Sequence, residues 1–107
     1  MRLRKELDEM QEKDILLMAQ ISDALAHPAR IKIFRFIMKC NKERQPVCNK
    51  DLVEEFSYAQ ATISQHVKKL IQADLIQVKK HDRFSYYYVH LGTLQNYLDA
   101  TKKFENM

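Results

Sequence analysis

Glycine and proline are scarce in this sequence. One glycine and two prolines are spread over 107 residues, although these are the residues that most often interrupt regular structure. So few interruptions predict long helices joined by few tight turns. The length predicts a single domain over residues 1–107 with a core of modest size.

The composition excludes several classes of protein. Hydrophobic residues make up 46% of the chain and charged residues 30%, a balance typical of globular proteins rather than disordered or membrane proteins. The longest purely apolar run, Ile15 to Ala19, is too short to cross a bilayer, and the first residues lack the apolar core of a signal peptide. We therefore expect a cytoplasmic protein with no membrane partner.

Apolar residues recur at helical spacing in five segments of the chain. The predicted helices run from about Lys5 to Ala26, from Pro28 to near Cys40, over Asp51 to Phe56 with Asn49 as N-cap, through the middle of residues 57–76 with Ala59 at the cap position, and from about Thr93 to Phe104.

The pattern changes after Asp74. The segments "LIQVKK" and "FSYYYV" are rich in β-branched and aromatic residues, and "HDR" between them favours a reversal. In the second strand we expect Tyr87 and Val89 on one face, with Tyr86 and Tyr88 on the other. The chain is thus predicted to be a mainly α (α+β) winged helix-turn-helix, with five helices and a two-stranded hairpin between the fourth and fifth.

The fourth helix has one apolar and one polar side. At about 100° per residue, Ile63, Val67 and Leu70 share one side, and short hydroxyl and amide groups cover much of the rest. Such groups suit base edges in a major groove, whereas lysines and a basic hairpin suit phosphates. The residues that we expect to contact DNA are Gln60, Ala61, Thr62, Ser64, Gln65, Lys68, Lys69, Lys79, Lys80 and Arg83. An ordinary solvated helix face is the alternative interpretation.

Basic side chains are concentrated in the middle of the chain. Residues 28–50 carry seven basic side chains and one acidic one, within a net charge of +4. This distribution predicts a polyanionic partner. If the hairpin and the fourth helix bind the same partner, that partner is double-stranded DNA.

Two segments resemble the ArsR/SmtB family of bacterial transcriptional repressors. They are "ISDALAHPARIKIFRFI" and "ATISQHVKKLIQADLIQVKKHDRFSYYYV", and the similarity extends over about Ile21 to Leu98. The resemblance implies a repressor that binds a partly palindromic operator as a homodimer and leaves it when an inducer or oxidant arrives. It places the dimer interface on the first and last helices, where the apolar candidates are Leu7, Met10, Leu17, Leu94, Tyr97, Leu98, Thr101 and Phe104.

The chain departs from the metal-sensing members of that family. Their "CVC" motif reads "CNK" here, so that Cys48 keeps the first thiolate and Lys50 replaces the second. The second known metal site is matched only near His90 and Thr93, and no histidine follows them. We therefore expect no metal and no cofactor, and the inducer stays unidentified.

Several alternatives remain open. Cys40 and Cys48 could form a thiol switch, in a repressor that senses oxidants or persulfide, or they could be inert packing groups.

The chain could also be a winged-helix interaction module that has lost DNA binding. Catalysis is not expected, because the sequence has no phosphate-binding glycine loop and no catalytic constellation. The partly apolar setting of His66 predicts a structural imidazole.

Overall fold

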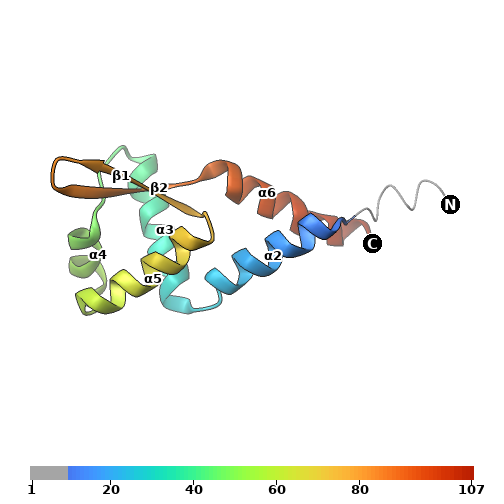
Figure 1. Cartoon of the computed structure of the whole chain (residues 1–107), viewed down its shortest axis with the longest axis horizontal. Helices are drawn as coiled ribbons and strands as arrows, with labels where there is room; N and C mark the ends of the chain where they lie inside the picture. The colour runs from blue at the N-terminus through green and yellow to red at the C-terminus, as the bar shows by residue number, and fades with distance from the viewer. Residues whose placement is uncertain (1–9) are drawn as a thin grey trace.

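The computed structural model describes residues 10–107 and contains five α-helices and one β-hairpin (Figure 1). The elements are α2 (Glu12–Ala24), α3 (Pro28–Lys42), α4 (Asn49–Phe56), α5 (Gln60–Gln72), β1 (Ile76–His81), β2 (Phe84–Val89), α6 (Leu91–Lys102) and the 3-10 helix η1 (Lys103–Asn106). This order confirms the predicted winged helix-turn-helix.

The molecule is elongated because two of its helices extend away from the other elements. The helices α3, α4 and α5 and the hairpin form one end, whereas α2 and α6 lie side by side and extend toward the C-terminus (Figure 1). The principal dimensions are 56 × 24 × 19 Å, and the radius of gyration is 16.3 Å. A compact chain of this length would have a radius of gyration of about 13 Å.

The core lies where α3 and α5 pack against the start of β1, at Leu75 and Ile76. It is built mainly of aliphatic side chains that are almost inaccessible to solvent. The largest are Ile21, Ile33, Ile37, Leu52, Ile63, Leu70, Leu75 and Ile76. Burying such side chains is the main favourable contribution to folding, and here it fixes α5 against the other helices.

The hairpin is short and tightly turned. Its strands pair antiparallel from Ile76 opposite Val89 to His81 opposite Phe84, so that only two residues form the turn. The first of them, Asp82, has φ of 59°, a conformation that Asp tolerates better than most residues. Tyr87 is 9% exposed and Tyr88 37% exposed, which confirms the predicted alternation of the tyrosines.

Asn41 joins the wing to α3. Its side-chain amide donates a hydrogen bond to the carbonyl of Tyr87 at 3.2 Å. Its side-chain carbonyl accepts one from the backbone amide of Val89 at 2.8 Å. Both bonds are partly buried, so one side chain fixes the angle between β2 and the C-terminal part of α3.

The prediction of Asn49 as N-cap of a helix starting at Asp51 was wrong. The helix α4 begins at Asn49, and Cys48 is its N-cap. The backbone amide of Cys48 donates to the carboxylate of Asp51 at 2.8 Å, which is the reciprocal half of a capping box.

Three other helices also begin or end at residues that differ from the predicted ones. The helix predicted from about Lys5 to Ala26 corresponds to α2, which covers Glu12–Ala24 within the described residues; residues 5–9, with Leu7, lie outside the described residues. Helix α3 continues to Lys42. The last helix begins at Leu91, because Nδ1 of His90 accepts the Thr93 amide at 2.9 Å and so caps it. It ends at Lys102, and Phe104 belongs to η1.

Candidate nucleic-acid interface

A tight turn joins α4 to α5. Ser57 follows the last residue of α4 in the left-handed region, with φ of 56°, and its amide donates to the carbonyl of Val53 at 3.0 Å. Ala59 occupies the N-cap position of α5 as expected, and among the described residues no side chain caps it. The two helices therefore form the helix-turn-helix unit that the fold requires.

Helix α5 presents its polar side to solvent. Ile63, Val67 and Leu70 are buried, as their spacing predicted. All seven residues of α5 that we expected to contact DNA are exposed. They are Gln60, Ala61, Thr62, Ser64, Gln65, Lys68 and Lys69. Their side chains are thus available to a groove of DNA, because the core holds the opposite side of the helix.

A groove joins this helix to the wing. It has a volume of about 340 Å³ and is lined by Cys48, Asn49, Lys50, Ser64, Arg83, Phe84, Ser85 and Tyr87. The Asn49 side-chain amide donates to the Ser64 hydroxyl at 3.4 Å, which connects α4 with α5. The structure therefore brings two of the predicted residues, Ser64 and Arg83, to one groove.

Asn49 and Lys50 were not among the predicted DNA-contacting residues. Lys50 belongs to the basic segment of residues 28–50, and that was the only signal in the sequence. The fold brings Lys50, at the start of α4, and Arg83, in the hairpin turn, to the lining of the same groove. The groove thus receives one cation from α4 and one from the wing.

The two wing lysines lie on opposite faces of the hairpin. Lys79 pairs with Tyr86, and its ammonium lies 5.2 Å from the ring centre of Tyr88 in a cation–π contact. Lys80 pairs with Ser85, which lines the groove. Because residues that pair directly share a face of a hairpin, Lys80 leaves the strand on the same face as Ser85 and Lys79 on the other. Both side chains nevertheless line one hollow beside Tyr86 and Tyr88, and Lys80 does not line the groove.

His66 packs against the N-terminus of α3. Its ring centre lies 4.8 Å from that of His27, with the planes at 50°, and His27 accepts the Ala29 amide through Nδ1 at 3.2 Å. Burial, followed by the nearby His27 and Arg30, lowers the pKa of His66 below its ordinary value of 6.5. The imidazole on α5 is thus part of the packing between two helices.

Both cysteines are free thiols, but their settings differ. Cys40 is buried and Cys48 is half-buried. Burial first, and then the charge of Glu43, raises the pKa of the Cys40 thiol, which disfavours the reactive thiolate. The thiol switch between them stays a prediction.

Within residues 10–107, no three His, Cys, Asp or Glu side chains come together as metal ligands do. No helix within residues 10–107 is long and apolar enough to cross a bilayer.

A family model described as a helix-turn-helix domain matches residues 25–79. The arsenical resistance operon repressor of Staphylococcus xylosus is 30% identical over 64 residues, which are 60% of this chain and 57% of that protein. The match thus spans little more than half the length of this relative.

Solved structures extend the likeness to the whole fold. An ArsR-like transcriptional regulator from Rhodococcus sp. RHA1 has a TM-score of 0.73 at 16% identity, covering 85% of this chain and 81% of its own. Reduced HlyU from Vibrio cholerae N16961 has a TM-score of 0.64 at 18% identity, covering 81% and 88%.

The Staphylococcus and Rhodococcus proteins are by name regulators of transcription and not enzymes, which agrees with the expectation that this chain is not an enzyme. The chain belongs to the helix-turn-helix domain family, and its fold is the winged helix-turn-helix of the ArsR-type transcriptional regulators.

Proposed function

We propose that the chain is a DNA-binding transcriptional repressor that acts in the cytoplasm as a homodimer on a partly palindromic operator. The observation that carries this proposal is the groove between α5 and the wing, where Ser64 meets Lys50 and Arg83. A polar helix face beside two cations matches the two needs of a DNA reader, which are base edges and phosphates.

The exposed side chains divide into two roles. Thr62, Ser64 and Gln65 are short or flat hydrogen-bonding groups on the exposed side of α5, and they are assigned to base edges in the major groove. The cations are assigned to phosphates, which contribute affinity rather than sequence information. These are Lys50, Lys68, Lys69, Lys79, Lys80 and Arg83.

The homodimer is supported by apolar side chains left uncovered along α2 and α6. Ile15 is 46% exposed and Leu16 61% on α2, while Leu98 on α6 is 44% and Phe104 after it 58% exposed. A second copy would remove these side chains from water. A two-fold axis would then place two α5 helices in successive major grooves, about 34 Å apart.

The other residues predicted for that interface have different surroundings. Leu17, Leu94 and Tyr97 are partly buried and pack against the core of the same chain. Met10 and Thr101 are half-buried. The proposed interface therefore depends mainly on Leu98 and Phe104, together with Ile15 and Leu16, which were not among the predicted interface residues.

The repressor role is supported by the similarity to the arsenical resistance operon repressor. Arsenic(III) is a soft ion that needs several thiolates. This chain has two cysteines in all, and Cys40 is buried in the core. We therefore propose that its signal is not an arsenical.

Selection of duplexes from a random pool, followed by fluorescence anisotropy over a range of salt concentrations, tests the proposal. We expect a selected sequence with partial two-fold symmetry, bound by two chains. Its affinity should fall steeply with salt. A plot of the logarithm of the binding constant against the logarithm of the salt concentration should have a slope of about −0.9 for each phosphate neutralised. Lys50→Gln should reduce that slope.

The matched control is Lys102→Gln, which removes the exposed lysine that ends α6. Helix α6 runs away from the wing toward the C-terminus (Figure 1). This variant should leave the salt dependence unchanged. If no duplex is enriched and binding never exceeds that of scrambled DNA, the DNA-binding proposal fails and the alternative, a protein-docking module, is favoured.

A further inference from the structure

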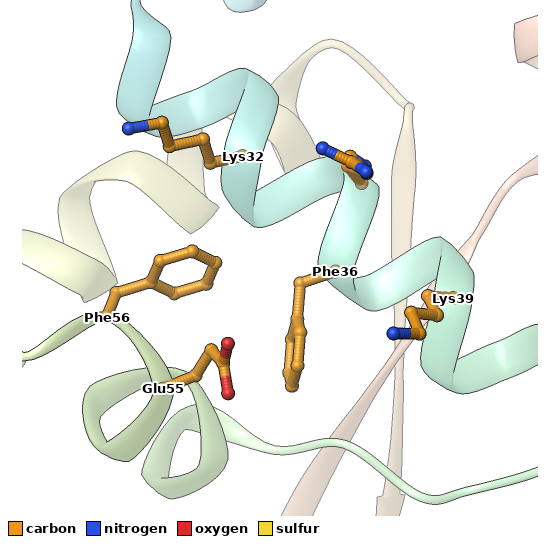
Figure 2. Close-up of a pocket in the computed structure, with 6 residues that line it drawn as sticks. Lys32, Phe36, Lys39, Glu55 and Phe56 are labelled. Carbon is orange, nitrogen blue, oxygen red and sulfur yellow. The ribbon is translucent and has the colours of Figure 1, made fainter.

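The basic residues of α3 form a ridge that the proposed DNA interface does not use. Lys32, Arg35 and Lys39 are all exposed and recur every three or four residues. They therefore lie along one side of the helix. This ridge borders a hollow between α3 and α4 (Figure 2).

The hollow has aromatic walls. Phe36 on α3 and Phe56 on α4 are half-buried, with ring centres 5.7 Å apart and planes at 80°. Figure 2 shows the two rings and the carboxylate of Glu55 directed into the gap between the helices. The hollow measures about 310 Å³, close to the lower end of small-molecule sites, which is about 300 Å³.

The charges around the hollow indicate which ligand it would hold. Three cations and one carboxylate line it, so it favours an anion. The two rings favour an apolar group, and a guanidinium such as that of Arg35 can bind a carboxylate through two hydrogen bonds. We propose that this hollow binds a small organic anion with one apolar ring, such as an aromatic carboxylate, whose charged group meets the α3 ridge.

The position of the hollow connects it with the helix-turn-helix. Phe56 is the last residue of α4, and its ring stacks on Tyr58 at 6.1 Å with an interplanar angle of 13°. Between them Ser57 makes the left-handed turn that leads to α5. A ligand that moves the ring of Phe56 therefore acts on the turn that orients α5. This regulatory step rests on the proposed function, whereas the binding step does not.

NMR titration of the DNA-free, ¹⁵N-labelled protein tests the site. The probe is phenylacetate, and its uncharged counterpart is phenylacetamide. We expect saturable shifts of the amides of Phe36, Phe56 and Tyr58 with phenylacetate, and much weaker ones with phenylacetamide.

Variants separate charge from shape. Arg35→Gln should weaken phenylacetate binding about tenfold, because it removes a charged hydrogen-bond donor. Glu55→Gln should strengthen binding, because it removes the one carboxylate that repels the anion. Lys42→Gln, which removes another exposed lysine of α3 that does not line the hollow, should leave binding unchanged.

Several outcomes would overturn the proposal. One is equal binding of phenylacetate and phenylacetamide, and another is the absence of saturable shifts with phenylacetate, indole-3-acetate and phenyl phosphate alike. If a short duplex shifts the α3 amides and these acids do not, the ridge is a DNA-backbone surface. Shifts that stop at Phe56 without reaching Tyr58 would reject the regulatory step. The results with the three acids and the amide do not depend on whether the chain binds an operator.

Discussion

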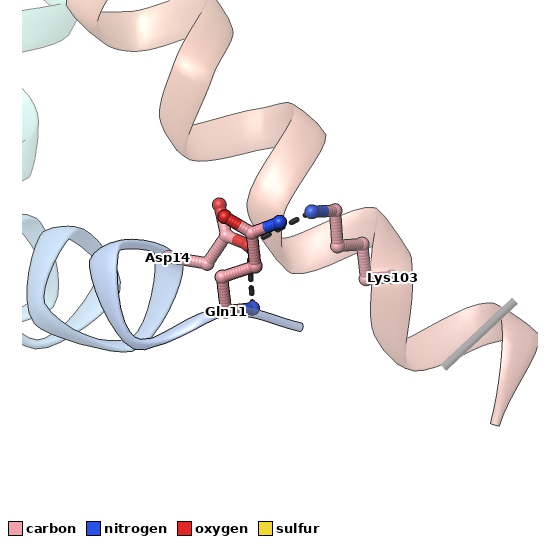
Figure 3. A network of polar contacts seen from close by, with 3 residues as sticks. All are labelled: Gln11, Asp14 and Lys103. Carbon is pink, nitrogen blue, oxygen red and sulfur yellow. Dashed lines mark hydrogen bonds and ion pairs between the residues drawn. The ribbon is translucent and has the colours of Figure 1, made fainter. Parts of the chain in front are cut away.

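The carboxylate of Asp14 lies 2.8 Å from the ammonium of Lys103, and this ion pair joins the beginning of α2 to the first residue of η1, directly after α6 (Figure 3). The same carboxylate oxygen accepts the backbone amide of Gln11 at 2.9 Å. The bond from Lys103, and then that from Gln11, holds the pKa of Asp14 below its ordinary value of 3.8. The pair therefore stabilises the fold as long as Asp14 is ionised.

Lys103→Met should lower the melting temperature near neutral pH, because Asp14 loses its ion pair and keeps only the bond from the Gln11 amide. The stabilisation by a carboxyl of lowered pKa is complete above the unfolded-state pKa and is lost as the pH falls through the folded-state pKa. The difference from the parent protein should therefore shrink below about pH 4. Thermal melts followed by circular dichroism would show this. Lys102→Met is the control, and an equal deficit at every pH would contradict the assignment.

His66 should make the fold less stable in mild acid. Its pKa is lowered in the folded state by burial and by His27 and Arg30, so the unfolded chain binds the proton more readily. This contribution to stability is complete above the ordinary pKa of 6.5 and is lost as the pH falls below it. Denaturant unfolding between about pH 7.5 and about pH 5 measures the free energy of unfolding. In the His66→Gln variant this free energy should change less with pH than in the parent protein. His81→Gln, at the exposed wing tip, should keep the parent dependence; identical curves for parent and His66→Gln would argue against this role.

Asn41→Ala should destabilise the protein by about 1–3 kcal/mol, because it leaves a partly buried carbonyl at Tyr87 and a partly buried amide at Val89 without their partner. Urea unfolding measures the change in the free energy of unfolding. Asn96→Ala removes an exposed asparagine from α6 and should change it by far less. Similar losses in the two variants would mean that Asn41 does not hold the wing.

Gln65→Ala and Lys80→Ala should affect DNA binding in different ways. Gln65 is exposed on α5 and is assigned to a base edge, so its loss should reduce discrimination between operator and altered sequences by about 1–3 kcal/mol. Lys80 is assigned to a phosphate, so its loss should weaken all duplexes alike and reduce the salt slope by about 1. Gel shifts on matched and scrambled operators distinguish the two. Equal losses on every sequence for both variants would reject these roles.

Leu98→Asp should dissociate the proposed homodimer, because it places a charge among the exposed apolar residues of α2 and α6. Ile31→Asp is the control, since Ile31 on α3 is 51% exposed and Leu98 44%. Light scattering at tens of micromolar gives the mass of each variant. A monomeric parent protein, or equal dissociation by both substitutions, would show that α2 and α6 do not form the interface.

The features that the sequence predicted well are those controlled by a short period. The buried side of α5, with Ile63 and Val67, follows from 3.6 residues per turn, and the burial of Tyr87 follows from the alternation of a strand. Both patterns are visible within one element. The order of helices and the position of the hairpin followed from them.

Helix ends were harder to predict because their caps are uncommon ones. A thiol and an imidazole rarely mark the start of a helix, yet Cys48 and His90 are the N-caps of α4 and α6. Asn49 was the more conventional choice, and the prediction followed it. Each helix consequently began two residues earlier than expected.

Features formed between elements could not be predicted at all. In the run from Ile15 to Ala19, period alone does not say which residues a neighbour covers; Leu17 packs against the core, and Ile15 and Leu16 remain exposed. Phe36 and Phe56 are far apart in the sequence, and the fold makes them the two walls of one hollow.

The elongated shape affects how the protein migrates in gel filtration. A particle 56 Å long and 24 Å wide experiences more friction than a sphere of equal mass, so it travels through a porous resin as if it were heavier. An early elution volume would therefore be expected even from single chains.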